Sequence, residues 1–325
     1  MQAITVGKND AGQKLHKLLA KYLNQAPKSF IYKMMRKKNI TLNGKKCDGT
    51  ELLSEGDEIK LFFSDETLAK FSQVEIQKVK KVNLDILYED EHILLVNKPA
   101  GMLSQKAKED DESLVEYVID YLLDSGALMK EELRSFRPSV CDRLDRNTSG
   151  IVVCGRSLPG LQIMAEVFKD RSLHKYYQCV AAGQVREKKR IRGWLWKDER
   201  TNRVTVSERE RAGSVFIETE YEPLAVGERF TLLSVTLLTG RSHQIRAHLA
   251  SIGHPIAGDH KYGDSSVNRY VKERYGITAQ MLHSCRLVFP AKLKEPLAYL
   301  SGREFTAPLP EAFKKVIDNE VSFRL

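Results

Sequence analysis

The chain has 325 residues, of which 42% are hydrophobic and 29% are charged, and its formal net charge is +9. This composition suits a soluble globular protein with one large and one small domain, and the excess of positive charge favours an anionic partner. No apolar run reaches membrane-spanning length and no apolar signal core follows Met1, so we expect a cytoplasmic protein without membrane association. The five cysteines form no CxxC pair, which excludes zinc-ribbon and redox motifs of that type.

The positive charge is concentrated near the N-terminus. Residues 1–81 hold 16 Lys and Arg against 9 Asp and Glu, a net of +7, whereas the rest of the chain has a net of +2. The spacing of apolar residues predicts a helix at 13–23, with lysines on its opposite face. A second short helix can begin at Pro27, because proline is tolerated in the first turn. The first quarter of the chain is therefore expected to be a basic binding module.

A tight hairpin turn at Asn43-Gly44 and strand-like residues at 59–63 follow these two helices. Their order, together with the I-x-L-N-G and EGDEI segments, resembles the small RNA-binding domain named after ribosomal protein S-four, over about residues 12–62. The resemblance implies a small N-terminal α/β RNA-binding domain, which we place at residues 1–63. The alternative is a small accessory domain with no particular affinity.

Residues 64–82 are polar and charged, and we predict a linker there with room for one short strand. The body of the protein is expected at 83–325. A continuous apolar run at 93–96 predicts a buried strand, and residues 161–168 have the spacing of an amphipathic helix. Many strand-like segments are mixed irregularly with a few helical ones. This pattern predicts an α+β fold whose sheet is mixed and largely antiparallel, with flanking helices.

The segment CDRLDRNTSG at 141–150 carries the clearest chemical signal. Asp145 lies between Arg143 and Arg146, and neighbouring positive charge favours an ionised carboxylate. Such a carboxylate can serve as a nucleophile or as a base. A short R-L-D alone is more often a surface ion pair beside a turn, so this reading depends on the longer string.

The longer string RLDRNTSG closely resembles the R-L-D-x-x-T-S-G signature of RluA-like RNA pseudouridine synthases. The resemblance implies that Asp145 is the catalytic aspartate and that Arg143 approaches the RNA, where it can occupy the space of a flipped-out nucleotide. The sequence departs from the commonest form at Asp142, where many members carry His. A second carboxylate in the pocket would oppose ionisation of Asp145. We therefore predict that Asp142 faces away from the site, towards a basic partner or solvent.

Three further blocks resemble the same family in the expected order. NKPAGM at 97–102 is similar to the block near the start of the catalytic domain. HKYYQCVAAG implies that Tyr177 is the active-site tyrosine, whose ring would stack near the target base. TGRSHQIRAHLASIGHPIAGDHKYG implies that Arg246 pairs with the catalytic aspartate. MLHSCRL implies that Leu282 packs against the target base.

No metal and no cofactor are expected. His243 and His248 lack the i, i+4 spacing that places two imidazoles on one helix face. The reaction implied by the resemblance breaks the glycosidic bond, rotates the uracil and rejoins it through ring carbon five, so no group is imported and no redox change occurs. The resemblance implies an isomerase acting on uridines of large-subunit ribosomal RNA, with transfer RNA as the second choice. We expect a monomer.

Two other classes of protein fit the sequence less well. A non-catalytic RNA-binding protein that retained the fold is expected to lack Asp145, Tyr177 or Arg246, and the sequence has all three. A different carboxylate enzyme, such as a glycoside hydrolase, needs a second catalytic carboxylate across the sugar. The matched blocks do not supply one.

The segment at 186–203 is basic and contains Trp194 and Trp196. We hypothesise that this hairpin-like excursion grips RNA through phosphate contacts. The alternative is an exposed loop that one tryptophan anchors to the body.

Overall fold

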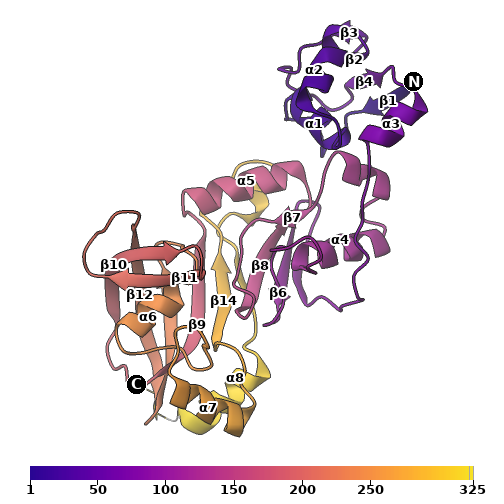
Figure 1. The fold of residues 1–325 in the computed structure, drawn as a ribbon. Coiled ribbons are helices and arrows are strands. Elements are labelled where there is room, and N and C mark those ends of the chain that lie inside the picture. The colour runs from indigo at the N-terminus through magenta and orange to yellow at the C-terminus, as the bar shows by residue number, and fades with distance from the viewer. Residues whose placement is uncertain (322, 325) are drawn as a thin grey trace.

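The computed structural model describes residues 1–321 and 323–324 and contains two separate β-sheets (Figure 1). The N-terminal sheet has the order β1-β4-β2-β3, and all of its pairs are antiparallel. Its strands are β1 (Gln2–Thr5), β2 (Ile40–Leu42), β3 (Lys45–Lys46) and β4 (Glu58–Leu61). Asn43 and Gly44 both have positive φ, which a two-residue hairpin turn of this kind requires, and they join β2 to β3 as the sequence predicted.

Two helices, α1 (Leu15–Tyr22) and α2 (Lys28–Arg36), pack in the N-terminal module. The buried side of the pair consists of the apolar residues Leu15, Leu18, Leu19, Tyr22, Ile31 and Met35. The exposed side carries the basic residues Lys14, Lys17, Lys21, Lys33, Arg36, Lys37 and Lys38. The amphipathic pattern thus places the apolar stripe in a core and leaves the positive charge in solvent.

The first part of the predicted linker differs from the expectation, because residues 65–71 form helix α3 (Asp65–Phe71). The Ser64 hydroxyl accepts a hydrogen bond from the Thr67 backbone N–H, as an N-cap does. Leu68 and Phe71 pack against the N-terminal core. Leu68 and Phe71 have helical spacing, but most of the residues around them are polar or charged. The sequence of the segment therefore resembles that of a linker. Residues 72–85 have no regular secondary structure.

The body is built on a twelve-stranded sheet whose main path is β11-β10-β12-β13-β9-β14-β8-β6-β5. Its strands are β5 (Ile86–Glu89), β6 (Ile93–Lys98), β7 (Ser139–Val140), β8 (Ser149–Gly155), β9 (His174–Ala182), β10 (Lys189–Asp198), β11 (Arg203–Ser207), β12 (Val215–Val226), β13 (Phe230–Leu237), β14 (Leu282–Val288), β15 (Glu304–Thr306) and β16 (Phe323–Arg324). Among the paired strands of the described residues, only β14 and β8 run parallel. The prediction of a mixed, largely antiparallel sheet is confirmed.

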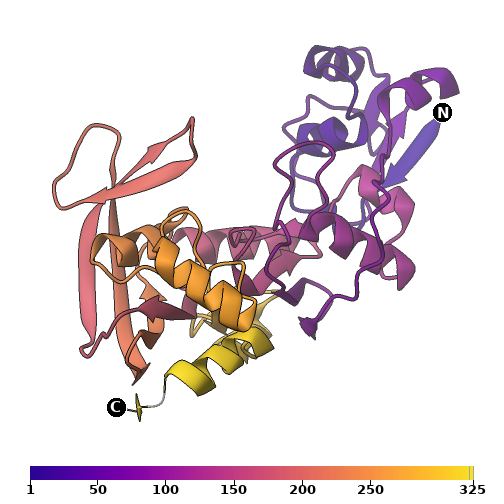
Figure 2. The ribbon, with the colours of Figure 1, turned by 60° about the horizontal axis from the view of Figure 1, so that its bottom comes forward.

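Helices flank this sheet, as predicted. They are α4 (Leu114–Asp124), η1 (Lys130–Arg134), α5 (Leu158–Lys169), α6 (Gln244–Ser251), α7 (Ser265–Tyr275), η2 (Ala298–Leu300) and α8 (Glu311–Glu320). The hairpin of β10 and β11 and the N-terminal module lie at opposite ends of the molecule (Figures 1 and 2). In the described part of the chain, no helix combines the length and apolar character that crossing a membrane requires.

Strand β6 shows why the central strands form a continuous apolar run. Leu94 and Val96 belong to one hydrophobic cluster, whereas Ile93 and Leu95 belong to another. Successive side chains of a strand point to opposite faces, so both faces of the sheet are covered here. Each fully buried side chain of this size contributes about 1.5–3 kcal/mol. The ends of these well-anchored strands support the loops described next.

Candidate active site

A cavity of about 1040 Å³ lies where the loops that precede β8, α6 and β14 meet. All of the residues that the sequence predicted for the site line it: Arg143, Asp145, Tyr177, Arg246 and Leu282. They come from four separate segments, and the adjacency of β8, β14 and β9 in the sheet brings them together.

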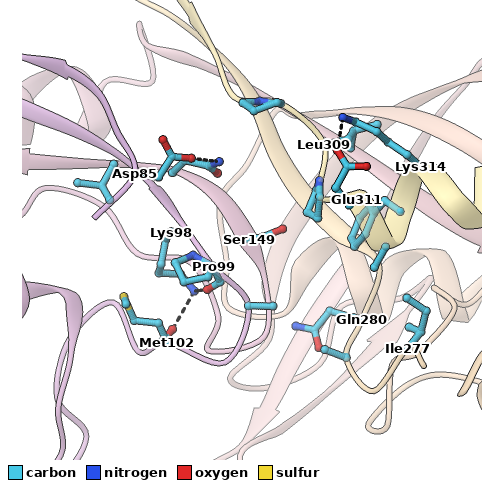
Figure 3. A pocket seen from close by; sticks show the side chains of 18 of the residues that line it. Asp85, Lys98, Pro99, Met102, Ser149, Ile277, Gln280, Leu309, Glu311 and Lys314 are labelled. Atoms are coloured by element: carbon cyan, nitrogen blue, oxygen red, sulfur yellow. Dashed lines mark hydrogen bonds and ion pairs between the residues drawn. The ribbon is translucent and has the colours of Figure 1, made fainter. Parts of the chain in front are cut away.

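A second cavity, of about 570 Å³, is lined by the turn 98–100, residues 276–280 and residues 308–314 (Figure 3). It adjoins the first cavity through Gln280 but contains neither Asp145 nor Arg246. We therefore place the chemistry in the larger cavity.

Asp145 is held by Arg246, whose Nη1 donates to its Oδ2 at 2.7 Å. The other edge of the guanidinium donates to fully buried Asp259, from Nε and Nη2 at 2.7 and 2.8 Å. Burial works against these charges, yet Asp259 and Asp145 raise the pKa of Arg246 above its ordinary value. Likewise, despite burial, Arg246 holds the pKa of Asp259 below its ordinary value. The bidentate pair fixes the guanidinium so that one N–H faces Asp145.

The backbone of the Asp145 loop is held by Lys98, a side chain with no exposed surface. Its ammonium donates to the carbonyls of Met102 at 2.8 Å, Pro99 at 3.1 Å, Arg146 at 3.1 Å and Asp145 at 3.3 Å (Figure 3 shows the turn). Burial lowers the pKa of Lys98 to about 7, and the Asp145 carboxylate opposes this shift. The NKPAGM block therefore has a structural explanation, since its lysine anchors the loop that carries the carboxylate.

Tyr177 lies on β9 and is 6% exposed. It lines the cavity, whereas its neighbour Tyr176 does not and instead packs under the Arg286 guanidinium at 3.8 Å. Burial raises the pKa of Tyr177, which keeps its hydroxyl protonated. Leu282 begins β14, pairs with Cys179 of β9 and is 4% exposed. The structure thus brings Tyr177 and Leu282 to the same wall of the cavity.

Asp142 forms an ion pair with Lys175 and accepts a hydrogen bond from the Val153 backbone N–H at 2.9 Å. The predicted basic partner is present. The prediction that Asp142 faces away from the site is wrong, because Asp142 and Asp145 both line the same cavity. The physical reason is compensation: the Lys175 ammonium neutralises Asp142, so no unpaired second carboxylate opposes Asp145. That ammonium also lies 5.7 Å from the centre of the Tyr177 ring.

The mouth of the cavity is strongly basic. Its exposed cationic side chains are Arg143, Arg146, Lys169, Arg171 and Arg241. Among the described residues, none of these five forms an ion pair with a carboxylate, which leaves their charge available to an anionic ligand. No group of His, Cys, Asp and Glu side chains in the described chain is arranged to hold a metal ion.

Sequence reasoning missed three residues that the geometry brings to the site: Lys98, Asp259 and His243. The signal for Lys98 was a lysine at the end of the apolar run of β6, where a charged residue needs a specific partner. Asp259 and His243 were both inside the matched 239–263 block, but nothing in the residue pattern predicted their contacts. His243 was considered only as a metal ligand.

The chain is similar to known proteins in sequence and in fold. Residues 92–251 match the family model described as RNA pseudouridylate synthase. The chain is 31% identical to ribosomal large subunit pseudouridine synthase C of Escherichia coli K12, over 89% of this chain and 88% of the relative. It is 29% identical to the protein of the same name from Vibrio vulnificus CMCP6, over 98% of this chain and 96% of the relative.

Solved structures show the same fold. Human RNA pseudouridylate synthase domain containing 4 superimposes with a TM-score of 0.57 at 20% identity, covering 72% of this chain and 91% of that one. Human RNA pseudouridylate synthase domain containing 1 gives 0.53 at 21% identity, covering 75% and 99%. At these identities the likeness concerns the fold alone. With the sequence relatives added, the conclusion is that the chain belongs to the RluA-like family of RNA pseudouridine synthases, which are isomerases.

Proposed function

We propose that this protein isomerises uridines to pseudouridines in large-subunit ribosomal RNA, with Asp145 as the catalytic carboxylate. The observation that carries the proposal is the fixed Asp145–Arg246 pair inside a basic cavity. The Oδ2 atom of Asp145 accepts a hydrogen bond from Arg246. The Oδ1 atom of Asp145 has no hydrogen-bond partner among the described residues and is available to the substrate. The names of the relatives supply the RNA class, and transfer RNA is the second candidate.

The roles of the remaining residues follow from chemistry. A target uridine has to leave the helical stack before its sugar can reach a carboxylate inside a cavity. Exposed Arg143 is suited to hold the vacated space, and Tyr177 and Leu282 supply the apolar wall for the uracil. Asp145 acts on the sugar either as a nucleophile or as a base, and Arg246 orients it. The reaction rearranges atoms already present in uridine, so it requires no imported group.

We also propose that residues 1–63 form an S-four-type RNA-binding domain, that 64–82 connect it to the catalytic domain at 83–325, and that the protein acts as a monomer. The exposed face of α1 and α2 supports RNA binding by this module. Its basic side chains form a positively charged surface for the phosphates of an RNA helix. Deleting this module should weaken binding to ribosomal RNA more than it slows conversion of bound RNA.

The 186–203 segment is the second proposed RNA contact. It includes β10, whose Arg190, Arg192, Trp194 and Trp196 alternate with buried residues and so lie on one face. Glu218 pairs with both arginines, which neutralises part of this face. Apart from Arg203, which lies over the Tyr262 ring, the cations of the segment that form no ion pair are Arg186, Lys189 and Arg200. Replacing these three with Ala should lower the salt dependence of RNA affinity; unchanged binding would reject the contact.

The decisive experiment incubates the protein with uridine-containing large-subunit ribosomal RNA and maps pseudouridine chemically. Wild type should form it, Asp145→Ala should not, and both should bind the RNA. Glu166→Gln, at an exposed carboxylate paired with Lys294, is the control and should remain active. Full activity of Asp145→Ala would reject the site. Binding without conversion by wild type would favour the non-catalytic alternative.

A further inference from the structure

His243 lies between Asp145 and Tyr262, and the Tyr262 hydroxyl is hydrogen-bonded to strand β11. Its Nδ1 is 2.8 Å from the Tyr262 hydroxyl oxygen, and its Nε2 is 3.9 Å from Asp145 Oδ2. The side chain is 12% exposed and lines the cavity. A separation of 3.9 Å is too long for a hydrogen bond, so Nε2 is directed to the space beside Asp145 without being bonded to it.

The hydrogen bonds of Tyr262 favour one of the two neutral tautomers of the His243 imidazole. Its oxygen accepts from the Val204 backbone N–H of β11 at 2.9 Å. The hydroxyl proton then has His243 Nδ1 as its partner among the described residues. Neutral histidine has one donor and one acceptor nitrogen. With Nδ1 accepting from Tyr262, the proton is on Nε2, and Nε2–H points into the cavity.

The backbone supports a role for the side chain rather than for the helix. His243 precedes α6 with a left-handed conformation, φ 57° and ψ 13°, which is unfavourable for a residue other than glycine. At this N-cap position it makes no side-chain capping hydrogen bond. The strained position therefore gives α6 no cap, and its visible consequence is that the imidazole reaches the space next to Asp145.

We propose that His243 donates a hydrogen bond from Nε2–H to a ribose oxygen of the uridine bound at Asp145, and that Tyr262 fixes the tautomer which makes this possible. The inference rests on the proposed function, because it needs a ribose at Asp145. Asp145 has to act on the sugar, so an N–H 3.9 Å from its carboxylate is within reach of the same sugar. The donor requires an acceptor, and the ribose supplies its ring oxygen and hydroxyl oxygens.

The charges around the imidazole agree with a neutral donor. Burial lowers the pKa of His243 below its ordinary value, and the cations Arg246 and Lys261 lower it further. The carboxylates Asp145 and Asp259 oppose this. A neutral ring can donate only through the nitrogen that Tyr262 leaves protonated. The hairpin strand β11 is thereby connected to the reacting sugar through Tyr262 and His243.

The test measures single-turnover conversion of a ribosomal RNA fragment at saturating protein, together with RNA affinity. His243→Asn suits the left-handed backbone, because Asn adopts it readily. It should convert bound RNA roughly 10–100-fold more slowly, which corresponds to one lost hydrogen bond in the transition state, with the Kd within about threefold of wild type. Tyr262→Phe should slow conversion less, and the double variant should be no slower than His243→Asn.

His260→Asn is the matched control, since this exposed histidine is hydrogen-bonded to the Thr278 carbonyl and lies outside the cavity. It should convert RNA at the wild-type rate. Nitrogen-15 NMR of the imidazoles in the RNA-free wild type supplies a readout independent of turnover, and His243 should carry its proton on Nε2. A proton on Nδ1, conversion by His243→Asn within twofold of wild type, or multiplicative effects in the double variant would each overturn the inference.

These outcomes separate the two proposals. Active wild type with an equally active His243→Asn removes the role of His243 and leaves the proposed function standing. Wild type that forms no pseudouridine in any RNA removes the proposed function and this inference with it.

Discussion

Asp259 should be essential to both stability and catalysis although it does not line the cavity that contains Asp145. Its carboxylate has no exposed surface and accepts two hydrogen bonds from Arg246. It also accepts the backbone N–H of Lys261 at 2.8 Å and of Tyr262 at 3.1 Å. Asp259→Asn keeps the shape but removes the charge, and it places an amide N–H where the guanidinium needs an acceptor.

The expected cost follows from the geometry. Breaking a buried ion pair by removing one partner costs about 3–5 kcal/mol. In a domain of this size 1 kcal/mol shifts Tm by roughly 2–4 °C, so Asp259→Asn should melt roughly 6–20 °C below wild type. Arg246 would then be free to turn away from Asp145. A displacement of about 1 Å at a reacting group can cost about 100-fold in rate, and we expect a loss of that order in single-turnover conversion.

Thermal unfolding and single-turnover conversion of ribosomal RNA measure the two effects. The control Glu166→Gln removes an exposed ion pair with Lys294 and should change stability by less than about 1 kcal/mol. In Arg246→Leu/Asp259→Leu, both charges are gone, so stability should recover part of the loss while activity stays absent. Wild-type stability or wild-type conversion by Asp259→Asn would refute the reasoning.

Three other changes have defined outcomes. Lys98→Met removes the ammonium that binds four carbonyls and leaves those of Pro99 and Met102 without a donor among the described residues, so conversion should fall roughly 100-fold at unchanged RNA affinity; an unchanged rate would contradict the anchoring role. Asp142 raises the pKa of Lys175, although burial acts in the opposite direction. Asp142→Asn should therefore lower the free energy of unfolding, measured with urea, by about 3–5 kcal/mol. A loss below about 1 kcal/mol would show that the pair is dispensable. Burial lowers the pKa of His248 and His283 to about 4. The unfolded chain therefore binds more protons between about pH 6.5 and 4, and folding stability should fall there by up to about 3 kcal/mol for each histidine. His283→Gln should flatten the fall in Tm between pH 7.5 and 5, and an equal fall in this variant would contradict the assignment.

Much of the architecture could be predicted because it depends on local patterns. The apolar run of β6, the stripe that became α5 and the Asn43-Gly44 turn each encode their structure within a few residues. The Asp145–Arg246 contact was also expected, from two motifs 101 residues apart, and the two side chains meet at 2.7 Å. The two motifs predicted that contact, whereas the periodicity of apolar residues does not predict it.

The remaining parts of the site depend on contacts that have no local signature. The carbonyls around Lys98 are backbone groups, so no residue type reveals them. The position of Asp142, in the loop between β7 and β8, depended on Lys175, which lies on β9, 33 residues later. Helix α3 was hidden because two apolar side chains among charged ones look the same as a linker until a core is present to receive them.

Strand β14 has a consequence for how the protein is made. It lies between β8 and β9, pairing parallel with the first and antiparallel with the second, although β9 ends about 100 residues and β8 about 130 residues before it begins. At Gly150, where β8 begins, a side chain would collide with the Ser284 backbone, so the fit at this junction is close. Until β14 leaves the ribosome, the parts of the edges of β8 and β9 that β14 will cover have no partner strand, and such open edges favour wrong pairing. Joining contacts so distant in sequence is slow, so chaperones should be most needed, and truncated chains most prone to aggregate, just before Leu282 is translated.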